Sequence, residues 1–247
     1  MGAASSLETR SRQLQYLQAM GIQVWNLRDS ALEPLGVEQG IADMAGKDAS
    51  PDAVPGQSAV SGVDWMTLQA RVEACTQCEL HGSRTQTVFG VGNRNADWLL
   101  IGEAPGRDED QQGEPFVGRA GQLLNAMLQA IGLQREQVYI ANILKCRPPN
   151  NRDPRPEEVV CCEPYLMRQI QLIQPRLILA LGRIAAQNLL NTETPIGKLR
   201  GKVHQFRDTG VPLIATYHPA YLLRSPLEKR KAWRDLQLAV ETLQGQV

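Results

Sequence analysis

The sequence lacks any apolar run of transmembrane length, and its polar N-terminus carries no secretory cleavage pattern. It is also poor in cysteine, and because the count of five is odd, the cysteines cannot all be paired in a closed disulfide framework. Free thiols are typical of a reducing compartment. We therefore expect a cytoplasmic protein that does not enter a membrane, with one cysteine, Cys161, left over from the site described below.

The sequence also has no net charge, but the charge is unevenly distributed. Residues 1–70 carry four Lys or Arg against eight Asp or Glu, whereas the rest of the chain carries 22 basic and 18 acidic residues. The basic excess is concentrated between Lys198 and Arg234. This pattern fits either an ordinary solvated surface or a face that contacts phosphate groups.

The pattern along the chain predicts three parts. Residues 1–29 contain an amphipathic stretch, with Leu14, Leu17 and Met20 at helical spacing. Residues 30–62 are rich in Ala, Gly, Pro, Ser and Asp and show no periodicity, which is typical of a flexible linker. Residues 63–247 have the composition of a globular domain.

In the globular part, short apolar runs alternate with helical patterns. The predicted strands are 98–101, 138–141, 177–181 and 212–216, and the predicted helices are 118–131, 156–173, 183–190 and 227–243. This alternation predicts an α/β fold, with βαβ units around a mainly parallel sheet and helices on both faces.

Each predicted strand runs directly into an unusual loop. The four loops begin with G-E-A-P-G, N-I-L-K-C-R-P-P, Gly182 followed by Arg183, and Y-H-P-A-Y-L-L-R. Ligands of open parallel sheets bind outside the carboxyl ends of the strands, which share one edge. The sequence therefore predicts that Glu103, Asn142 and His218 are neighbours in space.

Four cysteines form a second pattern: Cys75 and Cys78 in C-T-Q-C, then Cys146 and Cys162 in Pro-rich surroundings. Four thiolates that come together bind either a tetrahedral zinc ion or an iron–sulfur cluster, and the spacing does not separate the two. A redox dithiol is the alternative for C-T-Q-C taken alone.

Five motifs occur in order between about residues 70 and 243: C-T-Q-C, G-E-A-P-G-R-D-E-D, G-E-P-F-V-G-R-A-G-Q-L-L-N, A-N-I-L-K-C-R-P-P-N-N-R-D-P and H-P-A-Y-L-L-R. Each is weak alone, but the ordered set resembles the family 4 uracil-DNA glycosylases, the iron–sulfur branch of their superfamily. The resemblance implies a three-layer α/β/α sandwich with a central four-stranded, mainly parallel sheet. It also implies hydrolysis of the N-glycosidic bond of deoxyuridine in DNA, which starts base excision repair, and a [4Fe-4S] cluster on Cys75, Cys78, Cys146 and Cys162.

Three side chains suit this chemistry. A base that is excised has to leave the stack and be read at its Watson–Crick edge, and the Asn142 amide offers the donor and acceptor that match uracil O4 and N3–H. Phe116 can stack on the uracil ring, and His218 can donate to uracil O2, where negative charge develops as the C–N bond breaks. The alternatives are an Asn that closes a turn, a Phe in the core and a structural His.

The backbone of Glu103, Ala104 and Pro105 is expected to line the same site, because the glycines of G-E-A-P-G allow close approach. Family 1 enzymes carry at the position of Ala104 an Asp that positions the attacking water, so here the water has no obvious general base. Glu103 and Glu109 are candidate catalytic residues. Glu109 could exclude the thymine methyl or place water, and Glu103 would act mainly through its backbone.

The segment H-P-A-Y-L-L-R suggests a contact with DNA. Apolar side chains pushed between base steps hold a duplex open, which makes Leu222 or Leu223 a candidate wedge beside Arg224 on a phosphate. Ordinary packing at the start of a helix is the alternative.

Two other functions fit parts of the sequence. A family 5-type glycosylase with broader base tolerance is disfavoured by Asn142 as a uracil reader. A non-catalytic replication adaptor on a degenerate glycosylase fold is disfavoured by the presence of Asn142, Phe116 and His218 together. We expect a monomer whose substrate is DNA that contains uracil.

Residues 12–28, R-Q-L-Q-Y-L-Q-A-M-G-I-Q-V-W-N-L-R, lie outside this resemblance. They resemble the N-terminal peptide of the psi subunit of the bacterial replicative clamp loader. Trp25 is a suitable interface anchor, and a tether to clamp-loader subunits would raise the local concentration of the enzyme in the nucleoid, at the replication fork. The alternative is that this stretch packs on its own domain.

Overall fold

The computed structural model describes residue 60 and residues 62–245, so the predictions for residues 1–29 and for most of the linker lie outside the described residues. A six-stranded sheet forms the centre of the fold, in the order β1-β3-β2-β4-β6-β5. The strands are β1 (Val91–Gly92), β2 (Trp98–Gly102), β3 (Tyr139–Asn142), β4 (Leu177–Leu181), β5 (Val203–Phe206) and β6 (Val211–Thr216).

The four predicted strands are confirmed as the parallel centre of this sheet, β3-β2-β4-β6. Two antiparallel edge strands, β1 and β5, were not expected from the sequence. β1 has two residues and only Phe206 of β5 is buried, so neither strand carries the apolar run by which the central strands were recognised.

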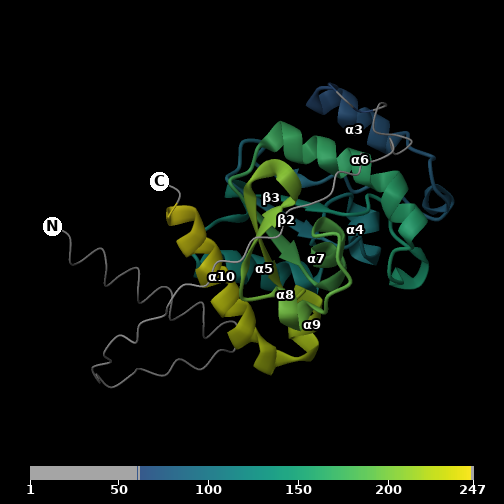
Figure 1. Ribbon diagram of the computed structural model, residues 1–247. Coiled ribbons are helices and arrows are strands. Elements are labelled where there is room, and N and C mark those ends of the chain that lie inside the picture. The colour runs from purple at the N-terminus through teal and green to yellow at the C-terminus, as the bar shows by residue number, and fades with distance from the viewer. Residues whose placement is uncertain (1–59, 61, 246–247) are drawn as a thin grey trace, which may run out of the picture.

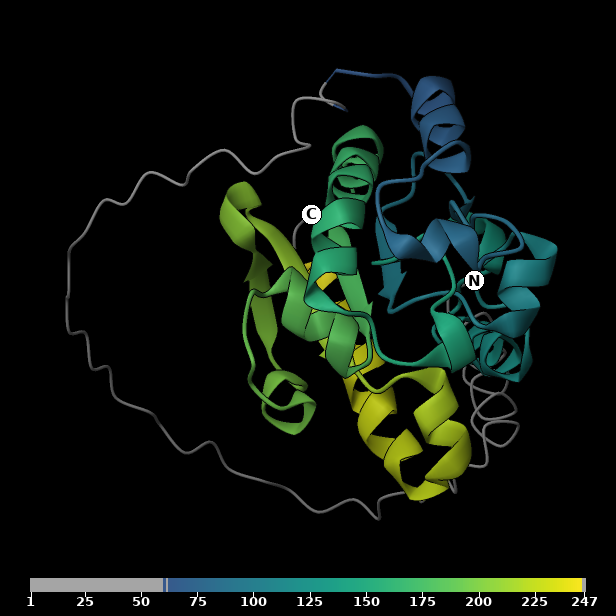
Figure 2. The same ribbon diagram turned by 90° about the vertical axis from the view of Figure 1, so that its right-hand side faces the viewer.

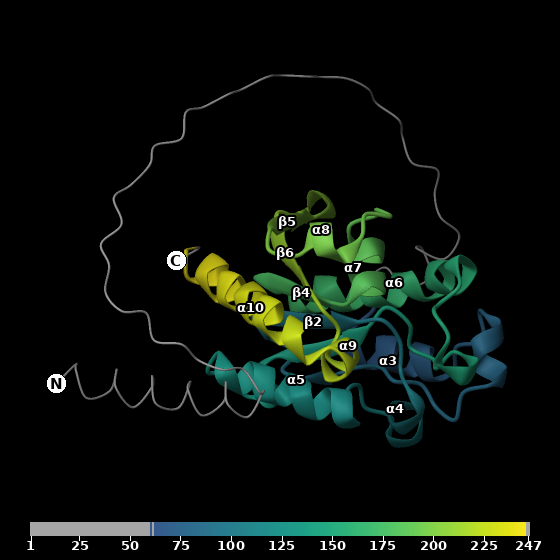
Figure 3. The same cartoon turned by 90° about the horizontal axis from the view of Figure 1, so that it is seen from below.

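Helices cover both faces of the sheet, as predicted (Figures 1 and 3). Side chains of β4 alternate between the two faces, with Leu177, Leu179 and Leu181 in one core cluster and Ile178 and Ala180 in the other. The first face packs against α5 (Arg119–Ala130), α9 (Pro219–Arg224) and α10 (Lys229–Gln244), and the second against α6 (Pro156–Ile173), α7 (Arg183–Leu189) and α8 (Ile196–Leu199).

The boundaries of α6 and α10 follow from local chemistry. α6 begins with Pro156, whose missing N–H costs nothing there, and Glu158 accepts a hydrogen bond from the N–H of Arg155 at 2.8 Å. α10 begins two residues later than predicted, because Pro226–Glu228 forms a separate 3-10 turn, η5.

A smaller layer lies beside α6 and contains the first two cysteines (Figure 2). It is built from α3 (Trp65–Glu73) and η1 (Glu79–Gly82), and Leu68, Val72 and Leu80 form its core. The remaining elements are α4 (Arg107–Gln112), η2 (Arg135–Gln137), η3 (Pro149–Asn151) and η4 (Arg207–Thr209). Within residues 62–245, no helix combines the length and the hydropathy needed to cross a membrane.

Candidate active site

A pocket of about 420 Å³ opens at the carboxyl edge of the parallel strands. The loops after β2 and β3 and the start of α9 contribute to its wall, so residues far apart in the sequence meet there. The sequence-predicted residues that line it are Glu103, Ala104, Pro105, Glu109, Phe116, Asn142, His218 and Arg224. The expectation that Glu103, Asn142 and His218 are neighbours therefore agrees with the geometry.

Asn142 ends β3 and is buried, yet its side-chain oxygen Oδ1 has no hydrogen-bond partner within the described residues. The strand end itself is fixed, because the buried Lys145 ammonium donates to the Asn142 carbonyl at 3.0 Å and to Gln169 Oε1 at 2.6 Å. A buried acceptor without a partner costs about 1–3 kcal/mol. Asn142 Oδ1 is therefore suited to an N–H donor from a bound molecule.

Phe116 lies against this amide and against His218. Its ring centroid is 5.4 Å from that of His218, with the two planes tilted by 30°. A Cβ added at Gly102 would lie 2.4 Å from Asn142 Oδ1 and 2.7 Å from the Phe116 ring, so only glycine allows this approach. Phe116 also packs in the core and has a positive φ of 55°, and Arg135 donates to its carbonyl at 3.3 Å.

His218 is the N-cap of α9, and its Nδ1 accepts a hydrogen bond from the Ala220 N–H at 3.1 Å. Nδ1 is thus unprotonated, and the neutral ring carries its proton on Nε2. Burial, and then the charge of Arg224, lower the pKa of His218 to about 4. At neutral pH, His218 is therefore an uncharged donor.

The backbone of Gly182 packs closely against His218. Its φ is +98°, and a Cβ at this position would lie 2.9 Å from the Cβ of His218. The Gly182 N–H also donates to the Thr216 carbonyl at 2.8 Å. The loop after β4 thus fixes the place of His218 through close backbone contact.

The Glu109 carboxylate accepts hydrogen bonds from backbone N–H groups of two loops. The donors are Gly106 at 3.1 Å, Val117 at 3.1 Å and Gly118 at 3.3 Å. Since both carboxylate oxygens are engaged in this way, Glu109 ties the G-E-A-P-G loop to the loop that carries Phe116.

Glu103 lines the pocket, and the pKa of its carboxyl group is raised. Burial raises the pKa of Glu103 to about 7, the charge of Asp153 acts in the same direction, and Arg183 partly opposes both. Arg183 Nη2 pairs with Asp153 Oδ2 at 2.6 Å. A carboxyl group that titrates near neutral pH in a pocket is typical of acid–base chemistry.

The predicted DNA contacts separate into one exposed and two packed residues. Arg224 is exposed and lines the pocket, whereas Leu223 is half-buried against the core. Leu222 is only 1% exposed and belongs to the core between α5 and α10. Leu222 could enter a base stack only by leaving that core.

A second cavity, beside α3 and α6, is lined by Cys75, Cys78, Cys146 and Cys162, together with Cys161. The N–H of Lys145 donates to Cys162 Sγ at 3.2 Å, and Arg84 Nη1 donates to Cys146 Sγ at 3.1 Å. Such donors suit thiolate ligands.

No three His, Cys, Asp or Glu side chains of the described residues lie close enough together to bind one metal ion. The four thiols of Cys75, Cys78, Cys146 and Cys162 share one cavity, and such a donor set suits a zinc ion as well as an iron–sulfur cluster.

Sequence reasoning missed several supporting residues, among them Lys145, Arg135 and Gly182. Lys145 stood inside the recognised K-C-R-P-P segment, but nothing in the sequence distinguishes a buried lysine from an exposed one. Gly182 directly follows a predicted strand, and a glycine at this position is the sequence feature that could have indicated its close approach to His218.

Comparisons with known proteins agree with this geometry. A family model of the uracil DNA glycosylase superfamily matches residues 89–237. The type-4 uracil-DNA glycosylase of Archaeoglobus fulgidus is 55% identical over 161 residues, which cover 63% of this chain and 81% of the relative. That of Thermotoga maritima is 47% identical over 159 residues, which cover 64% and 82%.

A type-5 uracil-DNA glycosylase of Thermus thermophilus is more distant, at 34% identity over 153 residues, which cover 53% of this chain and 68% of the relative. The higher identity to the type-4 enzymes agrees with the motifs, which favoured a type-4 glycosylase over the type-5 class with its broader base tolerance. The chain belongs to the uracil DNA glycosylase superfamily, and its motifs and relatives place it among the type-4 uracil-DNA glycosylases.

Proposed function

We propose that the pocket binds a uracil extruded from DNA and that the chain hydrolyses its N-glycosidic bond, the first step of base excision repair. The observation that carries this proposal is the unpartnered Oδ1 of buried Asn142 in the same pocket as His218. Uracil N3–H is the donor that Oδ1 lacks, and the Asn142 amide N–H suits uracil O4. Phe116 offers a face for the uracil ring.

His218 stabilises the departing base. As the bond between C1′ and N1 breaks, its electron pair goes to uracil, and negative charge gathers on O2. The Nε2–H of a neutral His218 donates to this oxygen, as does the backbone N–H of Ala104. Because the donors are held in place before the reaction, they lower the barrier without reorganisation, and one such donor is worth about 100-fold to 1000-fold in rate.

Glu103 places the water that completes the hydrolysis, with its side chain and not mainly through its backbone as we expected from the sequence. Its ionised carboxylate stabilises the positive charge left on the sugar, orients a water toward C1′ and receives the proton of that water. Support comes from its position in the pocket and from a pKa of about 7, which leaves a large fraction ionised at neutral pH. Glu109 acts as a positioning residue, because its oxygens are engaged by three backbone N–H groups.

Cys75, Cys78, Cys146 and Cys162 hold a [4Fe-4S] cluster, with Cys161 as a spare. When bound, the cluster supplies iron–sulfur bonds that join the segment after α3 to the loop after β3 and to α6. Hydrolysis of a glycosidic bond needs no electron, so the cluster is a structural staple. Purified protein should be brown and contain about four irons per chain, and colourless, zinc-loaded protein from an anaerobic preparation would overturn the assignment.

Release of free bases from synthetic oligonucleotides tests the proposed reaction. Single- and double-stranded DNA with one uracil, hypoxanthine or cytosine is incubated with the enzyme, and the abasic sites are counted. Release of uracil alone supports the proposal. Release of hypoxanthine as well indicates the broader type-5 range, and no release at all indicates an adaptor.

Residues 12–28 tether the enzyme, as a monomer, to clamp-loader subunits in the nucleoid. The support is the resemblance to the psi peptide and the apolar set around Trp25, and these residues lie outside the described part of the chain. A pull-down of clamp-loader subunits with residues 1–30 on an inert carrier tests the tether. Capture that is lost in Trp25→Ala supports it, and no capture, or capture unaffected by that change, removes it.

A further inference from the structure

Thr216, the last residue of β6, is fully buried and lies two positions before His218. Its hydroxyl Oγ1 donates to Asp235 Oδ2 on α10 at 2.8 Å, and its carbonyl accepts the Gly182 N–H at 2.8 Å. Thr216 is thus bound through its side chain as well as its backbone. A hydrogen bond closed off from water is stronger than one on the surface, so this contact constrains the strand end from which the His218 loop starts.

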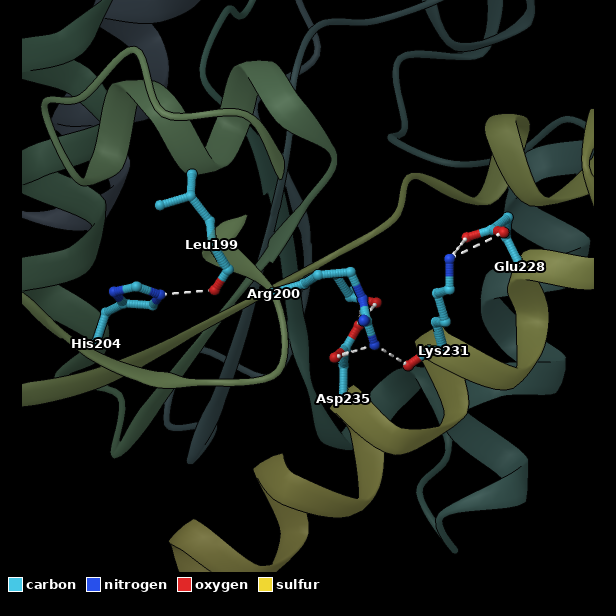
Figure 4. A network of polar contacts seen from close by, with 7 residues as sticks. Leu199, Arg200, His204, Glu228, Lys231 and Asp235 are labelled. Atoms are coloured by element: carbon cyan, nitrogen blue, oxygen red, sulfur yellow. Dashed lines mark hydrogen bonds and ion pairs between the residues drawn. The ribbon is translucent and has the colours of Figure 1, made fainter. Parts of the chain in front are cut away.

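The acceptor of this bond, Asp235, is held in place by Arg200. The Asp235 side chain has no exposed surface, and that of Arg200 is 14% exposed. Arg200 Nε donates to Asp235 Oδ2 at 3.0 Å and Nη2 donates to Oδ1 at 2.8 Å, and Nη2 also donates to the Lys231 carbonyl on the same helix (Figure 4). A bidentate pair of this kind fixes the direction of the carboxylate. Since Oδ2 also accepts from Thr216, the pair holds that oxygen toward the strand end.

The same guanidinium reaches Tyr217, the residue directly before His218. The Arg200 guanidinium carbon lies 5.5 Å from the centre of the Tyr217 ring, which is within the range of a cation–π contact. The Tyr217 hydroxyl is hydrogen-bonded to Glu228, the residue that precedes α10. Both residues that precede His218 are therefore tied to α10 or to the turn that begins it.

Net stability is a poor explanation for a buried ion pair at this place. The attraction between two buried charges is largely offset by the cost of taking them out of water, and apolar residues of similar volume often serve packing as well. The apolar neighbours Leu236 and Ala239 of α10 already pack in the core. What the pair between Asp235 and Arg200 adds is direction, because it holds the Thr216 hydroxyl at one point.

We propose that Asp235 and Arg200 are positioning residues of uracil release, which act on His218 through Thr216 and Tyr217. Neither is among the residues that line the pocket, whereas His218 is. They hold the end of β6 where the His218 Nε2–H can meet uracil O2. A misplacement of about 1 Å caused by a distant change can cost about 100-fold in rate. The proposal rests on the proposed release of uracil with His218 as the donor.

The test removes only the hydroxyl that joins β6 to this network. Thr216→Val keeps the branched shape and leaves the ion pair of Arg200 and Asp235 intact. The single-turnover rate of uracil release from single-stranded DNA should fall by about tenfold. The enzyme concentration that gives half of the maximal rate should change by less than about twofold, because binding is not affected. Thr216→Ser restores the hydroxyl and should recover most of the rate.

Thr242→Val is the matched control on the same helix as Asp235. Its hydroxyl donates to the Leu238 carbonyl at 2.7 Å, and Thr242 is not among the residues that line the pocket. The rate of Thr242→Val should equal that of the unchanged protein.

A double variant separates positioning from general damage. When Thr216→Val is added to His218→Ala, the further loss of rate should vanish to within about twofold, because the histidine that would be misplaced is gone. Arg200→Lys applies the same comparison without changing β6. Lysine keeps a positive charge but not the bidentate geometry, so the rate should fall when His218 is present and stay the same in His218→Ala.

Three results would each overturn the proposal: an unchanged rate in Thr216→Val and Arg200→Lys, an equal loss with and without His218, or no recovery in Thr216→Ser. Failure of the unchanged enzyme to release uracil would contradict the proposed function itself, before any variant is compared.

Discussion

The active-site pocket and the cysteine-lined cavity are four residues apart along the chain, from Asn142 to Cys146, but they are held by different means. In the pocket, Glu109, Lys145 and Arg135 hold backbone groups, and glycines allow the loops to touch. In the cavity, sulfur atoms from three separate segments face one space. The reactive groups are therefore placed by contacts within the protein, whereas the cysteine segments meet around the small core of Leu68, Val72 and Leu80, where the proposed cluster would join them.

The largest expected effect on the rate of uracil release is in the pocket. His218→Ala should lower the rate by about 100-fold to 1000-fold, because a donor to the developing charge is lost, while the unfolding midpoint and the iron content stay close to those of the unchanged protein. His204→Ala is the control, at a half-buried histidine that contacts the Leu199 carbonyl at 2.7 Å, and should keep the full rate. A wild-type rate for His218→Ala would contradict the mechanism.

A smaller but still large effect is expected from the backbone under His218. Gly182→Ala forces a Cβ within 2.9 Å of the His218 Cβ at a φ of +98°. The strain should cost about 1–3 kcal/mol of stability, and the displaced imidazole should lower the rate by up to about 100-fold. Gly197→Ala is the matched control, since a Cβ there meets no atom within 4 Å. Equal rates for the two variants would show that Gly182 does not place His218.

In the cysteine region, the effects should fall on iron content and stability, with a smaller effect on chemistry. Cys162→Ser should lose the iron and lower the unfolding midpoint, and the protein that remains folded should release uracil within about tenfold of the unchanged rate. Cys161→Ser should keep both iron and midpoint. If iron-free, folded protein lost activity as completely as His218→Ala, the cysteine region would be needed for the chemistry, which contradicts the distinction between the two regions.

The smallest expected effect is in the dependence on pH. The pKa of Glu103 is raised to about 7, mainly by burial, so its carboxyl group is neutral below that pH and ionised above it, and the rate should rise through this range. Glu103→Gln should abolish the rise, and Asp153→Asn should move it to lower pH. Titration of His218 should cause no change in the rate near pH 6.5, since its pKa is lowered to about 4. If the rise in rate near pH 7 persists in Glu103→Gln, a group other than Glu103 causes it.

The sequence predicts the parallel centre of the sheet because each central strand is a buried apolar run, and it predicts the pocket because parallel strands end at one edge. It does not predict β1 and β5, whose pairing depends on neighbours and not on their own pattern. It does not show that Leu222 packs in the core, because a six-residue helix is too short for its buried face to be recognised. The roles of Lys145 and Arg135 depend on contacts with residues that only the fold brings near.

The most direct test of the account is the base that Asn142 selects. The rates of uracil and cytosine release from otherwise identical oligonucleotides are measured for the unchanged protein and for Asn142→Asp. The unchanged protein should release uracil and leave cytosine. Asn142→Asp loses the amide donor for uracil O4 and offers an acceptor to the cytosine amino group, so uracil release should fall and cytosine release should become measurable. An Asn142→Asp protein that releases uracil at the unchanged rate and still leaves cytosine would contradict the claim that this amide reads the base.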